Sequence, residues 1–149
     1  MIRPWWIPEV PQSSDRSRCM ARARGAVAAG GVEYALRHYR NYLRRCPTDV
    51  AVRRELREVQ RALWAIRDRS DGLPPDQLRA ASEDEVRRIE LRPDPWQAIE
   101  RLEDLLTLDP HLRSAHLWLA RAAHTAEMRE VALFGLRDAL ALDPLDVDA

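Results

Sequence analysis

Apolar residues recur at steps of three and four along most of this chain, which is the spacing of amphipathic helices. β-Branched residues are scattered, and no alternating run is long enough for a strand. The pattern therefore predicts an all-α chain of about seven helices. Six of the expected helices cover residues 13–29, 32–45, 50–69, 96–108, 112–125 and 128–142. The remaining helix is expected to start at Pro75 or at Ser82 and to end at residue 91.

Glycine and proline mark the breaks between these helices. Gly30-Gly31 offers the left-handed residue at which helices often end. Thr48 and Asp49 are candidate N-caps for the helix after it. Ser82 begins a capping-box pattern that ends at Glu85, so a kink or a restart is expected there.

One tripeptide, which we call the Leu-Asp-Pro phrase, occurs twice in the last third of the chain. Leu108-Asp109-Pro110 recurs 34 residues later as Leu142-Asp143-Pro144. Proline lacks an N–H and disfavours the α conformation of the residue before it, so each copy predicts a helix end. A period of this size is typical of stacked helical hairpins.

Apolar residues at matching positions, which we call the repeat frame, precede each copy of the Leu-Asp-Pro phrase. Ala98, Leu102 and Leu105 align at this period with Ala132, Leu136 and Ala139. We expect the first alanine of each copy to lie where two antiparallel helices cross closely. We expect Leu102 and Leu136 to fill the space beside the crossing.

These residues resemble the tetratricopeptide repeat family, whose pattern is W-x2-L-G-x2-Y, A-x3-F and P. The best-matching unit spans residues 113–146, residues 79–112 match in their second helix, and an earlier match joins Ala35, Tyr39 and Pro47. In the best unit the pattern falls on His116, Leu119-Ala120, Ala123, Ala132, Leu136 and Pro144. The resemblance implies a short right-handed stack of antiparallel helical hairpins, a TPR-like α-solenoid.

The predicted organisation is an extended arm over residues 1–12, a single helical domain over 13–145 and a polar tail over 146–149. Within the domain we expect hairpin 13–47, an irregular long helix 48–70, loop 70–75, and hairpins 76–110 and 111–145.

The arm contains three prolines, which exclude a helix and favour an extended conformation. It carries Trp5, Trp6 and Ile7, an apolar group that needs a cover. Two interpretations remain open: the arm lies in a groove of its own repeats, or it anchors a different protein.

Charge is distributed unevenly although the net charge is zero. All 24 basic residues are arginine; the first 70 residues carry a net charge of +8 and the remainder −8. This asymmetry is consistent with an acidic partner, with head-to-tail self-association, or with arginine-rich composition alone.

Six arginines at helical spacing form a candidate basic patch. They are Arg37, Arg40 and Arg44 on one helix and Arg53, Arg57 and Arg61 on the next. Three interpretations remain open: solvated helix faces, a surface for an acidic protein, and a nucleic-acid surface.

No catalytic, metal or cofactor motif is recognised, so the sequence predicts a protein that is not an enzyme and needs no cofactor. His116 and His124 have no third ligand at metal-binding spacing. Cys19 and Cys46 are expected to be buried thiols. Without a signal peptide or a membrane-spanning run, the expected location is the cytoplasm.

The family resemblance also implies a concave groove that binds peptides or helices. Transferred to this chain, its groove-facing positions are Glu83, Arg87, Glu90, Leu117, Arg121, His124 and Thr125. The lysine–asparagine clamp with which some family members hold a carboxylate is absent, since the chain has no lysine and one asparagine. The expected function is a non-enzymatic adaptor, scaffold or accessory subunit that binds another protein; the alternative is an RNA- or ribonucleoprotein-associated protein.

Overall fold

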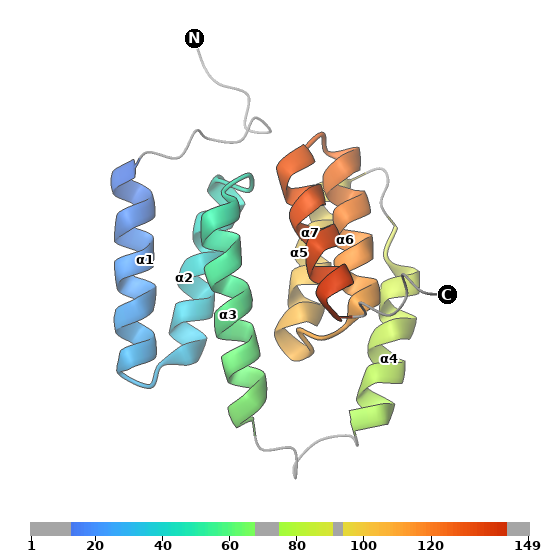
Figure 1. The fold of residues 1–149 in the computed structure, drawn as a ribbon, viewed down its shortest axis with the longest axis horizontal. Helices are drawn as coiled ribbons and strands as arrows, with labels where there is room; N and C mark the ends of the chain where they lie inside the picture. The colour runs from blue at the N-terminus through green and yellow to red at the C-terminus, as the bar shows by residue number, and fades with distance from the viewer. Residues whose placement is uncertain (1–12, 68–74, 91–93, 143–149) are drawn as a thin grey trace. The chain divides into compact units, whose positions relative to one another are not determined.

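The computed structural model describes residues 13–67, 75–90 and 94–142 (Figure 1), and every regular element within them is an α-helix. The prediction of an all-α chain is therefore confirmed for this part. The helices are α1 (Ser13–Ala28), α2 (Val32–Arg45), α3 (Val50–Ile66), α4 (Pro75–Arg88), α5 (Pro95–Leu108), α6 (Arg113–Thr125) and α7 (Arg129–Leu142). None of the described helices is long and apolar enough to cross a membrane.

Local chemistry explains most of the helix ends. Gly30, with φ of 82°, follows α1 in the left-handed conformation. The Asp49 carboxylate accepts from the Val52 backbone N–H at 3.3 Å and caps α3. Asp94 caps α5 in the same way, and Pro95 occupies the first helical position. After α5, Asp109 is extended, as expected for a residue that precedes proline.

Of the two predicted starts of the fourth helix, Pro75 is confirmed and Ser82 is wrong, because α4 is continuous from Pro75 to Arg88 and Ser82 is buried inside it. α4 ends at Arg88, three residues earlier than expected. α3 ends at Ile66, three residues earlier than expected. The predicted arm, the 70–75 loop before Pro75 and the 146–149 tail lie outside the described residues.

The chain divides into two compact units, Met1–Leu63 and Trp64–Ala149, with the division inside α3. The predicted single domain over residues 13–145 stays a prediction, and each unit is described by itself.

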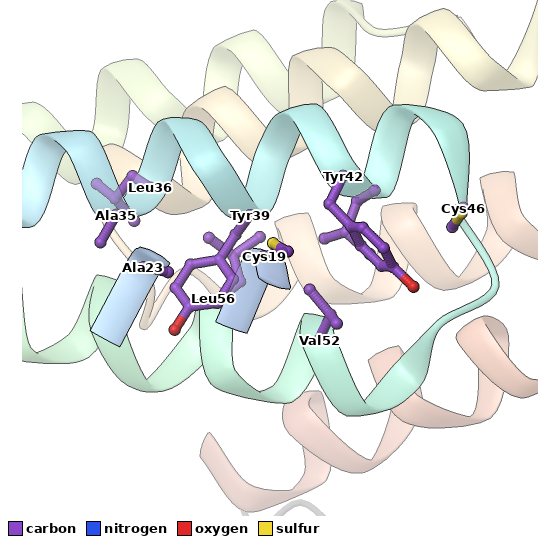
Figure 2. Packing of buried hydrophobic residues seen from close by; sticks show 10 residues of the cluster. Cys19, Ala23, Ala35, Leu36, Tyr39, Tyr42, Cys46, Val52 and Leu56 are labelled. Carbon is purple, nitrogen blue, oxygen red and sulfur yellow. The ribbon is translucent and has the colours of Figure 1, made fainter. Parts of the chain in front are cut away.

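The N-terminal unit has an apolar core between α1, α2 and the first part of α3 (Figure 2). Tyr39 and Tyr42 are its largest apolar members, and they lie beside Leu56 and Val52. Cys19 and Cys46 belong to the same core as free thiols, as predicted. The core thus combines aromatic rings from α2 with small and branched residues from α1 and α3.

Each core tyrosine donates a hydrogen bond to a carboxylate on or beside α3. The Tyr42 hydroxyl donates to Asp49 at 2.7 Å, and the Tyr39 hydroxyl donates to Glu55 at 3.2 Å. Two arginines of α1 bind the same carboxylates: Arg16 contacts Asp49 at 2.8 Å, and Arg24 contacts Glu55. Burial and the adjacent carboxylates raise the pKa of both tyrosines, so both remain protonated at neutral pH.

The C-terminal unit has its core between α5, α6 and α7, with α6 packed against both of the others. Ala98 and Ala132 are buried, as the repeat frame predicts. α6 and α7 pack closely at Gly135, where an added Cβ would lie 3.1 Å from the His116 carbonyl oxygen. Leu102 is fully buried, but Leu136 is 43% exposed, so the prediction that Leu136 fills the interior is wrong.

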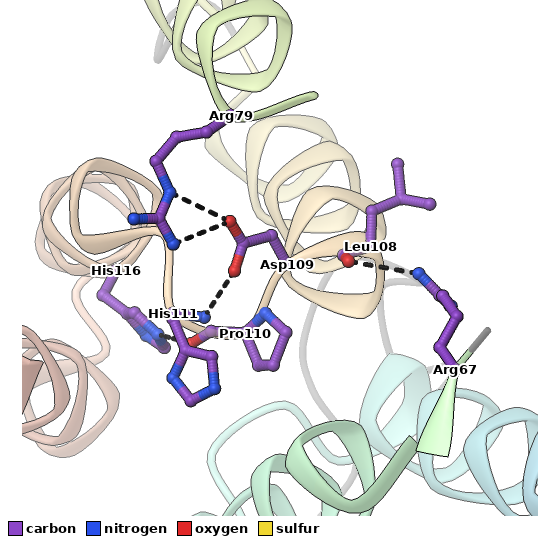
Figure 3. A network of polar contacts seen from close by, with 7 residues as sticks. All are labelled: Arg67, Arg79, Leu108, Asp109, Pro110, His111 and His116. Carbon is purple, nitrogen blue, oxygen red and sulfur yellow. Dashed lines mark hydrogen bonds and ion pairs between the residues drawn. The ribbon is translucent and has the colours of Figure 1, made fainter. Parts of the chain in front are cut away.

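A polar network surrounds the first Leu-Asp-Pro phrase (Figure 3). The Asp109 carboxylate accepts from the Arg79 guanidinium at 3.3 and 3.4 Å and from the His111 backbone N–H at 2.9 Å. The Pro110 carbonyl lies 2.8 Å from His116 Nε2. Asp109 thus links α4 to the α5–α6 turn within this unit.

Candidate functional site

The C-terminal unit carries a surface groove formed by two adjoining hollows, which we name the α4–α6–α7 groove. The larger hollow, about 770 Å³, is lined by Ala120, Arg121, His124, Thr125, Glu127, Arg129, Ala132, Leu133 and Leu136. The smaller, about 400 Å³, is lined by Glu83, Val86, Arg87, Ser114, Leu117, Trp118, Arg121 and Leu136. Arg121 and Leu136 line both hollows, so the two adjoin.

Six of the seven groove positions that the sequence predicts in this unit line one hollow or the other, whereas Glu90 lines neither. Arg121, His124 and Thr125 line the larger, and Glu83, Arg87 and Leu117 line the smaller together with Arg121. Binding at these residues stays a prediction, but the groove brings them together. The arm residues Trp5, Trp6 and Ile7 lie outside the described residues.

The groove contains exposed leucines of α7. Gly135 of the same helix lies against Ala120 and the His116 carbonyl of α6. We name three half-exposed leucines of α7 the α7 leucine row: Leu133, Leu136 and Leu140, which are 47%, 43% and 51% exposed. The first two line the groove. A row of half-exposed leucines beside a hollow marks a surface that gains free energy from being covered.

Polar contacts fix the wall of the groove on α6. The Trp118 indole N–H donates to the Ile89 carbonyl at 3.1 Å, which ties α6 to the residues that follow α4. The Arg121 guanidinium stacks over the Trp118 ring, 4.8 Å from its centroid. Arg121 is therefore held in place while its charge stays at the surface.

The turn between α6 and α7 forms one end of the larger hollow. Glu127 adopts a φ of 61°, and the Met128 N–H donates to the Ala123 carbonyl at 2.8 Å across this turn. The left-handed conformation reverses the chain so that Arg129 begins α7 at the edge of the hollow. The groove edge thus carries Arg121, Arg129, His124 and one acid, Glu127.

The candidate basic patch needs a correction. Arg53 and Arg57 are each only 1% exposed, so they form no surface patch with Arg37, Arg40, Arg44 and Arg61. Arg53 donates to the Pro47 carbonyl at 3.0 Å, and Arg57 donates to the Gln60 side chain at 3.0 Å. Both guanidinium groups hydrogen-bond within the N-terminal unit.

Several groove residues were missed from the sequence: Trp118, Arg129, Leu133 and Leu136. A signal for the leucines was present, because nine of the 14 residues of α7 are apolar, more than one buried face can hold. The signal for Trp118 was its place on the same helix as Leu117 and Arg121. Arg129 had no signal, since its position depends on the turn at Glu127.

The described residues contain no cluster of three or more His, Cys, Asp and Glu side chains that could hold a metal ion. His116 is buried, with Nε2 on the Pro110 carbonyl and Nδ1 3.8 Å from the Asp138 carboxylate, while His124 is exposed on the groove. Comparisons with family models, with curated proteins and with solved structures find no match to this chain.

Proposed function

We propose that this protein is a non-enzymatic adaptor that binds an amphipathic helix of another protein in the α4–α6–α7 groove. The observation that carries the proposal is the pair of half-exposed leucines, Leu133 and Leu136, set between Arg121 and Arg129 in the larger hollow. Helix-in-groove recognition uses apolar anchors at helical spacing in a hydrophobic groove.

The proposal includes the TPR-like stack that the sequence resemblance implies. Its support is the way α6 contacts α4, α5 and α7, together with the buried alanines of the repeat frame and the close crossing at Gly135. In such a stack the last helix needs a polar outer face or a cover. The exposed part of α7 carries the charged residues Arg129, Glu130 and Arg137 together with the α7 leucine row, and a partner helix is the cover we propose for the leucines.

Charge on the groove defines the partner further. Arg87, Arg121 and Arg129 outnumber Glu83 and Glu127 along the two hollows, and Arg121 is held by Trp118. A partner helix with Asp or Glu beside its apolar face complements this edge. The apolar contact provides affinity, and the arginines set orientation. The Trp5–Trp6–Ile7 arm is proposed as an additional contact.

A matched pair of leucines tests the groove. Leu136 and Leu108 are both 43% exposed and both lie in the C-terminal unit, but only Leu136 lines the groove. We expect peptides selected from a display library of amphipathic helices, with leucines fixed and flanking positions randomised, to be enriched in Asp and Glu. Leu136→Asp should weaken their binding about tenfold or more, because one buried leucine contributes about 1.5–3 kcal/mol. Leu108→Asp should leave it unchanged.

Far-UV circular dichroism of both variants serves as the folding control. Equal affinities for Leu136→Asp and Leu108→Asp would reject the groove as the binding surface. A selection that yields no more binders than a library of scrambled helices would reject a helix as the occupant.

A further inference from the structure

A third hollow lies in the N-terminal unit, far in sequence from the groove. Its volume is about 450 Å³, and its lining is polar. The residues come from α1 and α2: Asp15, Arg18, Cys19, Arg22, His38, Asn41, Tyr42 and Arg45. A hollow of this size is within the range of sites that hold small molecules.

The lining is cationic. It contains three arginines against a single acid, Asp15, and it includes His38. In the part of the chain that the structure describes, neither a hydrogen bond nor an ion pair engages Arg18, Arg22 or Arg45. The other two arginines of α1 differ, because Arg16 and Arg24 bind the Asp49 and Glu55 carboxylates. The carboxylates of this core are thus used by one set of arginines, while another set faces the hollow.

The remaining lining groups add no negative charge. Burial raises the pKa of the Cys19 thiol to about 11, so it stays neutral, and it donates to the His38 carbonyl at 3.5 Å. The Tyr42 hydroxyl is turned to Asp49. The Asn41 side-chain oxygen accepts from Arg44 at 3.0 Å, which leaves the Asn41 amide N–H groups as donors. The floor is therefore neutral, and the walls carry donors and positive charge.

We propose that this hollow binds a small anion that carries two or more phosphate groups. Guanidinium groups match phosphate oxygens in pairs of hydrogen bonds, and arginine retains its charge at any physiological pH. Arg18 and Arg22 are one helical turn apart on α1, and Arg45 comes from α2, so the anion is held from two helices. A bounded hollow favours a compact polyphosphate over a nucleic-acid strand, which needs an extended charged surface.

The test is calorimetric titration of the full chain with sodium tripolyphosphate at low salt. We expect saturable binding with a Kd below about 1 mM. Arg18→Gln/Arg22→Gln should weaken binding at least about tenfold, because charge-assisted hydrogen bonds to the phosphate groups are lost. Arg45→Gln should also weaken it. The matched control is Arg37→Gln/Arg54→Gln, which removes the same charge from exposed positions outside the hollow and should leave the Kd within about twofold.

Three results would overturn the proposal: no saturable binding, equal weakening by the two double variants, or binding of a single-stranded RNA that tripolyphosphate does not displace. Circular dichroism of each variant verifies folding, and the exposed positions of all four arginines make glutamine structurally tolerable. None of these variants touches the α4–α6–α7 groove, so failure here leaves the proposed function standing.

Discussion

Asp49 is the residue on which the polar structure of the N-terminal unit converges. Its carboxylate accepts from the Tyr42 hydroxyl, the Arg16 guanidinium and the Val52 backbone N–H. It therefore connects α1, α2 and the start of α3. The Asp49 side chain is almost fully buried, whereas the Arg16 side chain is 44% exposed. Most of the stabilisation that Asp49 provides therefore comes from the cap of α3 and from the hydrogen bond with Tyr42, and less from the ion pair with Arg16.

We expect Asp49→Ala to lower the free energy of unfolding by about 2–4 kcal/mol. About 1 kcal/mol comes from the lost cap of α3, and about 1–3 kcal/mol from leaving the buried Tyr42 hydroxyl unpaired. Urea unfolding followed by circular dichroism measures the loss.

Tyr42→Phe supplies the second arm of a double-mutant cycle for Asp49→Ala. With the hydroxyl removed, Asp49→Ala should cost less than it does in the wild type. Additive losses in the cycle would contradict the role assigned to the Tyr42–Asp49 hydrogen bond.

At the scale of elements, the close packing of α6 against α7 depends on the absence of a Cβ at Gly135. A Cβ at Gly135 would lie 3.1 Å from the His116 carbonyl oxygen and 3.2 Å from the Ala120 Cβ. Both contacts are tighter than ordinary van der Waals contact, and one of them is to backbone. Gly25 in α1 offers a contrast, because no atom lies within 4 Å of its added Cβ.

These two glycines predict opposite effects of alanine. Gly25→Ala should stabilise α1 by about 0.5–1 kcal/mol, since alanine is the better helix former. Gly135→Ala gains the same propensity but adds an overpacking cost of about 1–3 kcal/mol, so it should destabilise α6–α7 by about 1 kcal/mol. Hydrogen exchange read by mass spectrometry reports each helix separately. Equal stabilisation by both substitutions would show that α6 and α7 can separate without cost.

The helix boundaries that were predictable are those that one or two residues decide locally. Gly30 and Asp49 act through their own backbone or side chain, so spacing along the sequence was sufficient. Ser82 has the same local signal, but tertiary burial inside α4 overrides it.

Residues whose role depends on neighbouring elements were not predictable. The i, i+4 spacing correctly places Arg53 and Arg57 on one face of α3, but spacing does not reveal that this face is buried. The prediction for Leu136 was wrong in the opposite way, because a residue expected to be buried is exposed. Gly135 is the residue of α7 that packs against α6, and Leu136 beside it is half exposed. Six of the seven groove positions transferred from the repeat pattern line the α4–α6–α7 groove, since they depend on which helix face is shared; Glu90, which follows the end of α4, does not.

At the scale of the whole molecule, the two units carry different surfaces. The C-terminal unit presents an apolar groove with charged edges, and the N-terminal unit presents a cationic hollow over a neutral floor. Part of the positive charge of the first half of the sequence therefore lies at the hollow of the N-terminal unit. Arg18, Arg22 and Arg45 carry this part, whereas Arg53 and Arg57 of the α3 stripe are buried.

The arm over residues 1–12 provides the test at this scale. The proposal that the arm contacts a partner predicts that deleting residues 1–12 leaves the helical circular dichroism spectrum intact and changes the free energy of unfolding by less than about 0.5 kcal/mol. Because the arm is proposed as an additional contact, the same deletion should weaken binding of a helix partner, and Trp5→Ala/Trp6→Ala should reproduce that loss. A large drop in stability would instead place the two tryptophans in the core, and the arm would then be part of the fold.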